Sequence, residues 1–171
     1  MPQVHVCCLS LVPVTVAATR ASHLVSLIDD NTIVERPPTI PAERHLFIGI
    51  NDITEPTEGL IAPALEHVEQ LLAFVEDWDR RNPMVVHCYA GISRSTAAAF
   101  IALCAANPGR AEAEIAWKMR AASPTATPNS RIVAFGDALL RRNGRMIAAA
   151  QAIGRGEMAV EGIPFAIAIE N

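Results

Sequence analysis

The sequence predicts an α/β fold in a single domain. Short apolar runs of strand length alternate with longer segments of helical periodicity, which is typical of a sheet covered by helices. A chain of 171 residues corresponds to about one domain, and its 51% hydrophobic content is enough for one sizeable core. We therefore expect residues 1–171 to form one domain, with 143–171 docked on it as a C-terminal tail.

Four apolar runs have the length and composition of buried strands. They are QVHVCCL (3–9), HLVSLID (23–29), RHLFIGI (44–50) and MVVHC (84–88). A short helical segment at 14–20 separates the first two runs. In the tail, Ile163, Phe165, Ile167 and Ile169 alternate with proline and alanine, which predicts an edge strand or a docked extended segment.

The clearest helix extends from Ile61 to Trp78, where apolar residues recur every three or four positions and acidic residues occupy the other face. The segment 95–106 is apolar on nearly all sides, which predicts a central helix packed on several faces. Helical patterns follow at 111–122 and 130–142, and residues 146–153 continue the last of them. The proline-rich segment 35–44 and the turn-rich segment 51–59 are predicted to be loops.

Charge and cysteine content exclude several classes of protein. The net charge is -4 without long blocks of one sign, so nothing suggests binding to nucleic acid or to an anionic membrane, and any anion recognition must be local. The four cysteines lack the spacing of a zinc site and the density of a disulfide scaffold, which indicates reduced thiols. Polar residues and two prolines interrupt the uncharged stretch 1–19, so we expect a buried strand there and a cytoplasmic protein.

The stretch VVHCYAGISRSTAAAF (85–100) places five residues between Cys88 and Arg94. A strand that ends at Cys88, a loop of small residues and a helix that begins near Arg94 would direct backbone N–H groups and a positive helix end into one concavity. The dipoles and the charge of Arg94 would favour the thiolate, which is the nucleophilic form, and the arginine fork suits two phosphoryl oxygens. We therefore predict a nucleophile facing a phosphate. The alternative, a core thiol followed by a surface arginine, does not explain the flanking His87, Ser95 and buried helix.

The segment HCYAGISRS (87–95) resembles the H-C-x-x-G-x-x-R-S/T signature of the cysteine-dependent protein tyrosine phosphatases, in particular their compact dual-specificity branch. The segment TPNSRIVAFGDALL (127–140) is similar to the P-N-x-x-F/L part of a late helix in that branch. The resemblance implies a twisted, mostly parallel central sheet with helices on both faces. It also implies two-step hydrolysis of phosphate esters on a phosphorylated protein, with no metal or organic cofactor.

The resemblance also implies roles for individual residues. Cys88 would attack phosphorus and become the phosphocysteine, while Ser95 would donate a hydrogen bond to the departing thiolate. His87 would orient the loop from behind, and Asn129 would support it. The phosphoryl oxygens would be held by Arg94 and by the backbone amides of the phosphate loop, which comprises Tyr89, Ala90, Gly91, Ile92, Ser93 and Arg94.

The family also places an aspartate on a loop a few dozen residues before the cysteine, as the general acid. Asp52 lies 36 positions before Cys88 and follows a predicted strand, so it is our candidate. A turn-capping aspartate is the structural alternative. Glu55 and Glu58 share the loop and are the reserve candidates.

The variable loop positions Tyr89, Ala90, Ile92 and Ser93 include none of the lysines with which phosphoinositide phosphatases of this superfamily bind additional phosphates. Phosphotyrosine is therefore the favoured substrate, with phosphoserine and phosphothreonine next, and we expect a monomer. Two other functions stay open: a phosphate-binding pseudophosphatase, and a rhodanese-type sulfurtransferase. The rhodanese loop is one residue shorter between its cysteine and arginine, which argues against the second.

Overall fold

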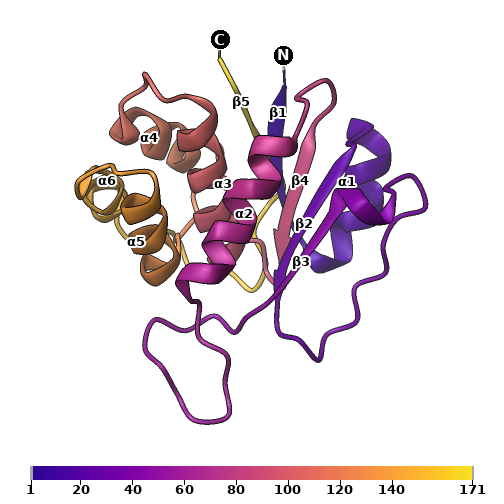
Figure 1. Cartoon of the computed structure of the whole chain (residues 1–171), viewed down its shortest axis with the longest axis horizontal. Helices are drawn as coiled ribbons and strands as arrows, with labels where there is room; N and C mark the ends of the chain where they lie inside the picture. Colours follow the sequence, from indigo (N-terminus) through magenta and orange to yellow (C-terminus); the bar gives the residue numbers. More distant parts are fainter. Residues whose placement is uncertain (1, 171) are drawn as a thin grey trace.

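The computed structural model describes residues 2–170 and confirms the predicted α/β class (Figure 1). A five-stranded sheet has the order β3-β2-β4-β1-β5. Four strands are parallel, and only the last runs antiparallel, against β1. The strands are β1 (Gln3–Cys8), β2 (His23–Ile28), β3 (His45–Gly49), β4 (Met84–Cys88) and β5 (Phe165–Ala168).

Helices cover both faces of the sheet. Helix α1 packs on one face, and the remaining helices gather on the other (Figure 1). The first face has a small core around Val12, Val16 and Leu24, whereas the second holds the main core. The helices are α1 (Val12–Thr19), α2 (Leu65–Asp77), α3 (Arg94–Ala106), α4 (Glu112–Ala122), α5 (Ser130–Leu139) and α6 (Arg145–Ile153). Short 3-10 turns occupy Leu9–Leu11 and Ala42–Arg44.

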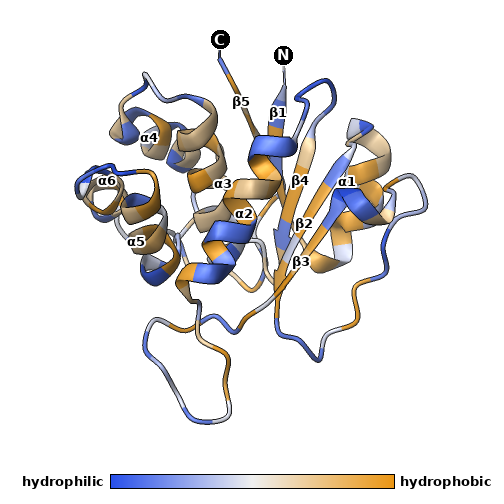
Figure 2. Cartoon of the chain, in the orientation of Figure 1, coloured by the Kyte–Doolittle hydropathy of each residue, from blue (hydrophilic) through white to orange (hydrophobic). Residues whose placement is uncertain are grey.

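Helix α3 is the central helix that its composition predicts. Twelve of its 13 residues are buried, and it contacts the sheet as well as α2, α4 and α5. Close approach to α5 depends on Gly136, because a Cβ atom there would lie 2.5 Å from the side chain of Ile101. Helix α2 is amphipathic instead, with apolar and polar residues on opposite sides (Figure 2). The start of α3, which carries Arg94, is therefore held rigidly against the sheet.

Two predicted helix boundaries were wrong. The helix expected from Ile61 begins at Leu65, because Ala64 is extended and Pro63 disfavours helix in the residue before it. The helix expected to reach Arg142 ends at Leu139, and the chain turns through Arg141 and Asn143, which both have positive φ. The segment that continues the pattern is a separate helix, α6, whose start is capped by the carboxylate of Asp137.

The tail returns to the sheet and supplies its edge. Strand β5 pairs with β1, so the two ends of the described chain lie side by side (Figure 1). Phe165 and Ile167 are buried as the alternation predicts, whereas Ile163 is 76% exposed. Among residues 2–170, no helix is both long enough and apolar enough to span a bilayer.

Candidate active site

Cys88 is the last residue of β4, at the edge of the sheet where the parallel strands have their carboxyl ends. This edge is where α/β proteins usually bind ligands. The side chain of Cys88 is only 2% exposed. Its Sγ atom accepts a hydrogen bond from the Gly91 amide at 3.2 Å and lies 3.1 Å from Ser95 Oγ. The sulfur therefore has one backbone donor and one hydroxyl beside it, and this hydroxyl can donate to a thiolate.

The loop from Tyr89 to Ser93 turns its backbone amides inward because its carbonyl groups are bound from outside. A backbone amide from another part of the chain donates to four of the five carbonyls. The pairs are Leu9 with Tyr89 (3.1 Å), Gly162 with Ala90 (2.8 Å), Thr127 with Ile92 (2.9 Å) and Asn129 with Ser93 (3.3 Å). With the carbonyls fixed outward, the loop forms a cradle of N–H donors that suits an anion.

Gly91 is required in this loop for two reasons. Its φ of +73° lies in the left-handed region that favours glycine. A Cβ atom at this position would also lie 2.8 Å from the backbone of Cys7 and Cys8. The loop therefore rests directly on the end of β1.

Arg94 has a buried donor with nothing to bind. The residue is 8% exposed, and its Nη1 donates to the carbonyl oxygen of Ile50 at 2.8 Å. Its Nε is buried and has no hydrogen-bond partner within residues 2–170. A buried unpaired donor costs free energy, and a phosphoryl oxygen in the cradle would satisfy it.

His87 lies behind the loop in a chain of hydrogen bonds that fixes its tautomer. Its Nδ1 lies 3.1 Å from the carbonyl oxygen of Cys88, which can only accept, so Nδ1 carries the hydrogen. Burial lowers the pKa of His87 to about 4, so near neutral pH the ring is uncharged and Nε2 accepts from Ser26 Oγ at 2.6 Å. His45 Nε2 then donates to the same hydroxyl at 2.8 Å. His87 is therefore placed to orient the loop from behind. Both of its ring nitrogens are bonded outside the cradle, to the Cys88 carbonyl oxygen and to Ser26 Oγ.

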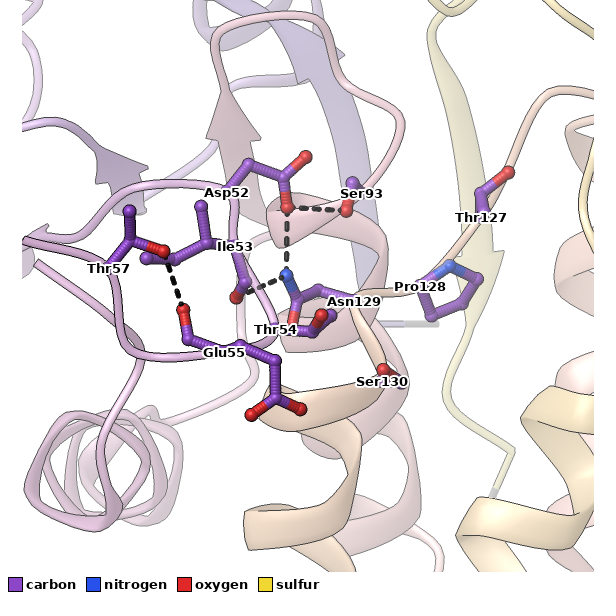
Figure 3. Close-up of a pocket in the computed structure, with 10 residues that line it drawn as sticks. All are labelled: Asp52, Ile53, Thr54, Glu55, Thr57, Ser93, Thr127, Pro128, Asn129 and Ser130. Carbon is purple, nitrogen blue, oxygen red and sulfur yellow. Dashed lines mark hydrogen bonds between the residues drawn. The ribbon is translucent and has the colours of Figure 1, made fainter. Parts of the chain in front are cut away.

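Asp52 lies beside the phosphate loop, in a cleft of about 570 Å³ (Figure 3). One oxygen of its carboxyl group accepts from Ser93 Oγ at 2.7 Å and from Asn129 Nδ2 at 2.9 Å. Glu55 lines the same cleft, whereas Glu58 is exposed and does not line it. The structure thus brings Asp52 and Asn129 to the loop, as the roles expected for them require, and leaves Glu58 outside.

The segment that carries Asp52 is tied to the rest of the site by residues that sequence patterns did not single out. Arg131 Nε donates to the carbonyl oxygen of Pro63 at 2.6 Å, close to the end of this segment. Gly162 and Thr127 hold the phosphate loop from outside. These contacts join positions more than 30 residues apart, and no local motif marks them.

The other three cysteines are buried and free, and they lie in the strand β1 and the helix α3. Burial raises the pKa of Cys7 and that of Cys104 to about 12, which keeps both as unreactive thiols. Within residues 2–170, no group of His, Cys, Asp and Glu side chains could hold a metal ion.

Comparison with known proteins relates this arrangement to one family. Residues 57–121, which include the cradle and the start of α3, match the family described as protein-tyrosine phosphatase. A search of curated proteins found no match to the sequence.

Several solved structures share the fold. Human DUSP28 gives a TM-score of 0.61 at 19% identity, over 81% of this chain and 94% of that one. The PTP-2 phosphatase of Cydia pomonella gives 0.62 at 18% identity, over 79% of this chain and 84% of that one. PTPMT1 in complex with PI(5)P gives 0.59 at 12% identity, over 88% and 91%. At these identities the likenesses concern the fold, which is shared over most of the chain.

Proposed function

We propose that this chain, whose residues 57–121 match the protein-tyrosine phosphatase family and whose fold is that of the dual-specificity phosphatases, hydrolyses phosphate monoesters on phosphorylated proteins through a phosphocysteine at Cys88. One observation carries the proposal: the Cys88 sulfur accepts from the Gly91 amide in the loop that leads to Arg94, whose buried Nε has no partner among residues 2–170. A phosphoryl group would supply the missing acceptor next to the nucleophile.

In the first step, the Cys88 thiolate attacks phosphorus, the P–S bond forms and the bond to the leaving oxygen breaks. Arg94 and the inward amides hold the other phosphoryl oxygens and stabilise their charge in the transition state. The leaving oxygen takes its electron pair and receives a proton from Asp52. The product alcohol or phenol then departs.

In the second step, water attacks phosphorus and loses a proton to the Asp52 carboxylate. The P–S bond breaks, and inorganic phosphate is released. Ser95 Oγ, 3.1 Å from the sulfur, donates a hydrogen bond to the thiolate that leaves. Cys88 and Asp52 return to their starting protonation states, so the cycle needs no further reactant.

For the substrate, we propose phosphotyrosine in proteins, with phosphoserine and phosphothreonine as the weaker alternatives. The variable loop side chains carry no cation for a second phosphate, and Tyr89 at the rim is 60% exposed and able to contact an aromatic substrate. The solved structure of PTPMT1, which has the same fold, is in complex with the phosphoinositide PI(5)P. Phosphoinositides are therefore the substrate class to compare with phosphotyrosine peptides. The four free thiols support a cytoplasmic location.

A non-hydrolysing phosphate-binding module is the second candidate function. It would use the same cradle but would not need Cys88, Ser95 and Asp52 in reacting positions. The hydrogen bonds that connect these groups to the loop favour the enzyme. A rhodanese-type sulfurtransferase is disfavoured by the five residues between Cys88 and Arg94.

Hydrolysis of p-nitrophenyl phosphate tests the proposal. Cys88→Ser and Arg94→Lys should each abolish turnover while the protein stays folded, because a serine hydroxyl is not ionised and lysine lacks the planar fork. Cys104→Ala, a change at a buried thiol outside the site, is the matched control and should keep most of the activity. A phosphatase rate that survives Cys88→Ser, or sulfur transfer from thiosulfate without phosphate release, would overturn the proposal.

A panel of phosphopeptides and phosphoinositides then tests the substrate class, with Cys88→Ser used to trap bound substrates. The highest kcat/KM should belong to a phosphotyrosine peptide. A phosphoinositide that exceeds every phosphotyrosine peptide would overturn the assignment to protein substrates.

A further inference from the structure

The two oxygens of the Asp52 carboxyl group have different surroundings. Oδ1 accepts two hydrogen bonds, from Ser93 Oγ at 2.7 Å and from Asn129 Nδ2 at 2.9 Å. Figure 3 shows the other oxygen, Oδ2, directed away from both donors. The Asp52 side chain is exposed, and it lines the cleft beside the phosphate loop.

The orientation of the Asn129 amide is fixed by the helix that it caps. Its Oδ1 accepts from the backbone amides of Arg131 and Ile132, both at 3.1 Å, as an N-cap residue does. Its Nδ2 therefore faces Asp52 and the carbonyl oxygen of Ile53, at 3.3 Å. A flipped amide would lose both capping bonds and point an oxygen at Asp52 Oδ1, so Asn129, which is 5% exposed, can only donate to it.

The Ser93 hydroxyl is the second donor and belongs to the phosphate loop itself. The backbone carbonyl oxygen of Ser93 accepts from the Asn129 backbone amide at 3.3 Å and from Thr96 Oγ1 at 3.0 Å. The loop and the start of α5 are therefore fixed relative to each other. Ser93 Oγ from the loop and Asn129 Nδ2 from the start of α5 both donate to Asp52 Oδ1.

We propose that Ser93 and Asn129 are positioning residues that place the transferable proton of Asp52 on Oδ2. A proton on Oδ1 would be repelled by the two donor hydrogens that point at this oxygen. A proton on Oδ2 leaves the hydrogen bonds from Ser93 and Asn129 intact. During the first step this proton moves to the leaving oxygen as the P–O bond breaks, and the same two bonds then stabilise the Asp52 carboxylate. The inference rests on the proposed function, in which Asp52 is the general acid.

Ser93→Ala and Asn129→Ser test the inference because each removes one donor to Asp52 Oδ1; Asn129→Ser also loses the longer bond to the Ile53 carbonyl oxygen. Ser93→Ala keeps the loop amide, and serine at 129 still caps α5. On phenyl phosphate, whose leaving group is poor, each variant should lower kcat roughly tenfold, a part of the ~10²–10⁴-fold that a positioned acid contributes. On p-nitrophenyl phosphate, whose leaving group needs little protonation, kcat should change little.

Three controls separate positioning from a structural effect. Ser130→Ala alters a neighbouring serine that lines the same cleft but makes no bond to Asp52, and it should leave both rates unchanged. Ser93→Thr retains a hydroxyl and should restore most of the activity. In a variant that already carries Asp52→Asn, adding Ser93→Ala should not lower kcat on phenyl phosphate any further.

The possible failures can be told apart. The inference would be overturned if Ser93→Ala and Asn129→Ser lowered kcat equally on both substrates, or if Ser93→Ala lowered kcat as much in the Asp52→Asn variant as in the wild type. The proposed phosphatase function would be unaffected by either result. If the wild-type protein hydrolysed neither aryl phosphate, the proposed function itself would be wrong.

Discussion

Arg94 shows at the scale of one residue how the fold prepares a site for an anion. Its position at the first turn of a fully packed helix buries the guanidinium group, and the Ile50 carbonyl uses one of its donors. Nε remains buried without a partner. An arginine that served only to stabilise the fold would have its donors satisfied, so the unpaired donor is better explained by a ligand.

Inorganic phosphate should therefore stabilise the protein through Arg94. At a phosphate concentration 100 times its Kd, the gain in unfolding free energy should be about 2.7 kcal/mol. Thermal unfolding with and without phosphate measures this gain. Arg94→Met, which keeps the stem and removes the guanidinium group, should abolish it, while sodium chloride at equal ionic strength is the control. An equal shift of the unfolding temperature in the variant would exclude Arg94 as the phosphate ligand.

At the scale of elements, the segment between α6 and β5 contributes to the site although it lies far from the signature in sequence. The Gly156 amide donates to Thr127 Oγ1 at 3.0 Å, and the Gly162 amide donates to the Ala90 carbonyl oxygen at 2.8 Å. Residues Arg155–Ala159 also line a cleft of about 300 Å³ together with Asp52 and Ser93. The tail thus holds the outer side of the phosphate loop before it pairs with β1.

Gly162→Ala should impair the phosphate loop. A Cβ atom at 162 would lie 2.9 Å from the Gly91 carbonyl oxygen, so the tail must move and the bond to Ala90 must lengthen. We expect kcat/KM for an aryl phosphate to fall roughly tenfold, which corresponds to about 1.4 kcal/mol, the usual worth of one hydrogen bond.

Gly109→Ala is the matched control for this variant, since a Cβ atom there meets nothing within 4 Å. Its steady-state kinetics should equal those of the wild type. If Gly162→Ala kept full activity, the tail would have no role in shaping the loop.

At the scale of the whole molecule, buried histidines link the stability of the sheet to pH. His87, Ser26 and His45 connect the three strands β4, β2 and β3 by side-chain hydrogen bonds. Burial lowers the pKa of His87 to about 4, and burial also lowers the pKa values of His5, His23, His45 and His67. The folded state therefore binds fewer protons than the unfolded state in mildly acidic solution.

The free energy of unfolding should consequently fall as the pH is lowered. The contribution of His87 is complete above its unfolded pKa of 6.5 and is lost as the pH falls through about 4, and it amounts to roughly 3 kcal/mol. Urea unfolding at a series of pH values measures it. His87→Asn, which keeps a donor for the Cys88 carbonyl, should flatten the slope by about one proton. An unchanged slope in the variant would show that other groups cause the acid sensitivity.

Local features of the site and fold were predictable from the sequence because they depend on neighbouring residues. The strand, loop and helix around Cys88 and Arg94 lie within 16 consecutive residues, and the periodicity of α2 and the all-round apolar character of α3 show which faces are buried. Helix ends were less predictable, since the positive φ of Arg141 and Asn143 follows from how α6 packs on α4 and α5.

The sequence by itself thus determined the α/β class, the elements and the cradle at the end of β4, since periodicity and short-range hydrogen bonding are properties of consecutive residues. Only the tertiary structure decided which residues surround that cradle. Asp52 meets Ser93 and Asn129, and Gly162 meets Ala90, across separations of 41, 77 and 72 residues. Such pairs form because the order of strands in the sheet and the return of the tail bring distant segments together, and no local pattern encodes that arrangement.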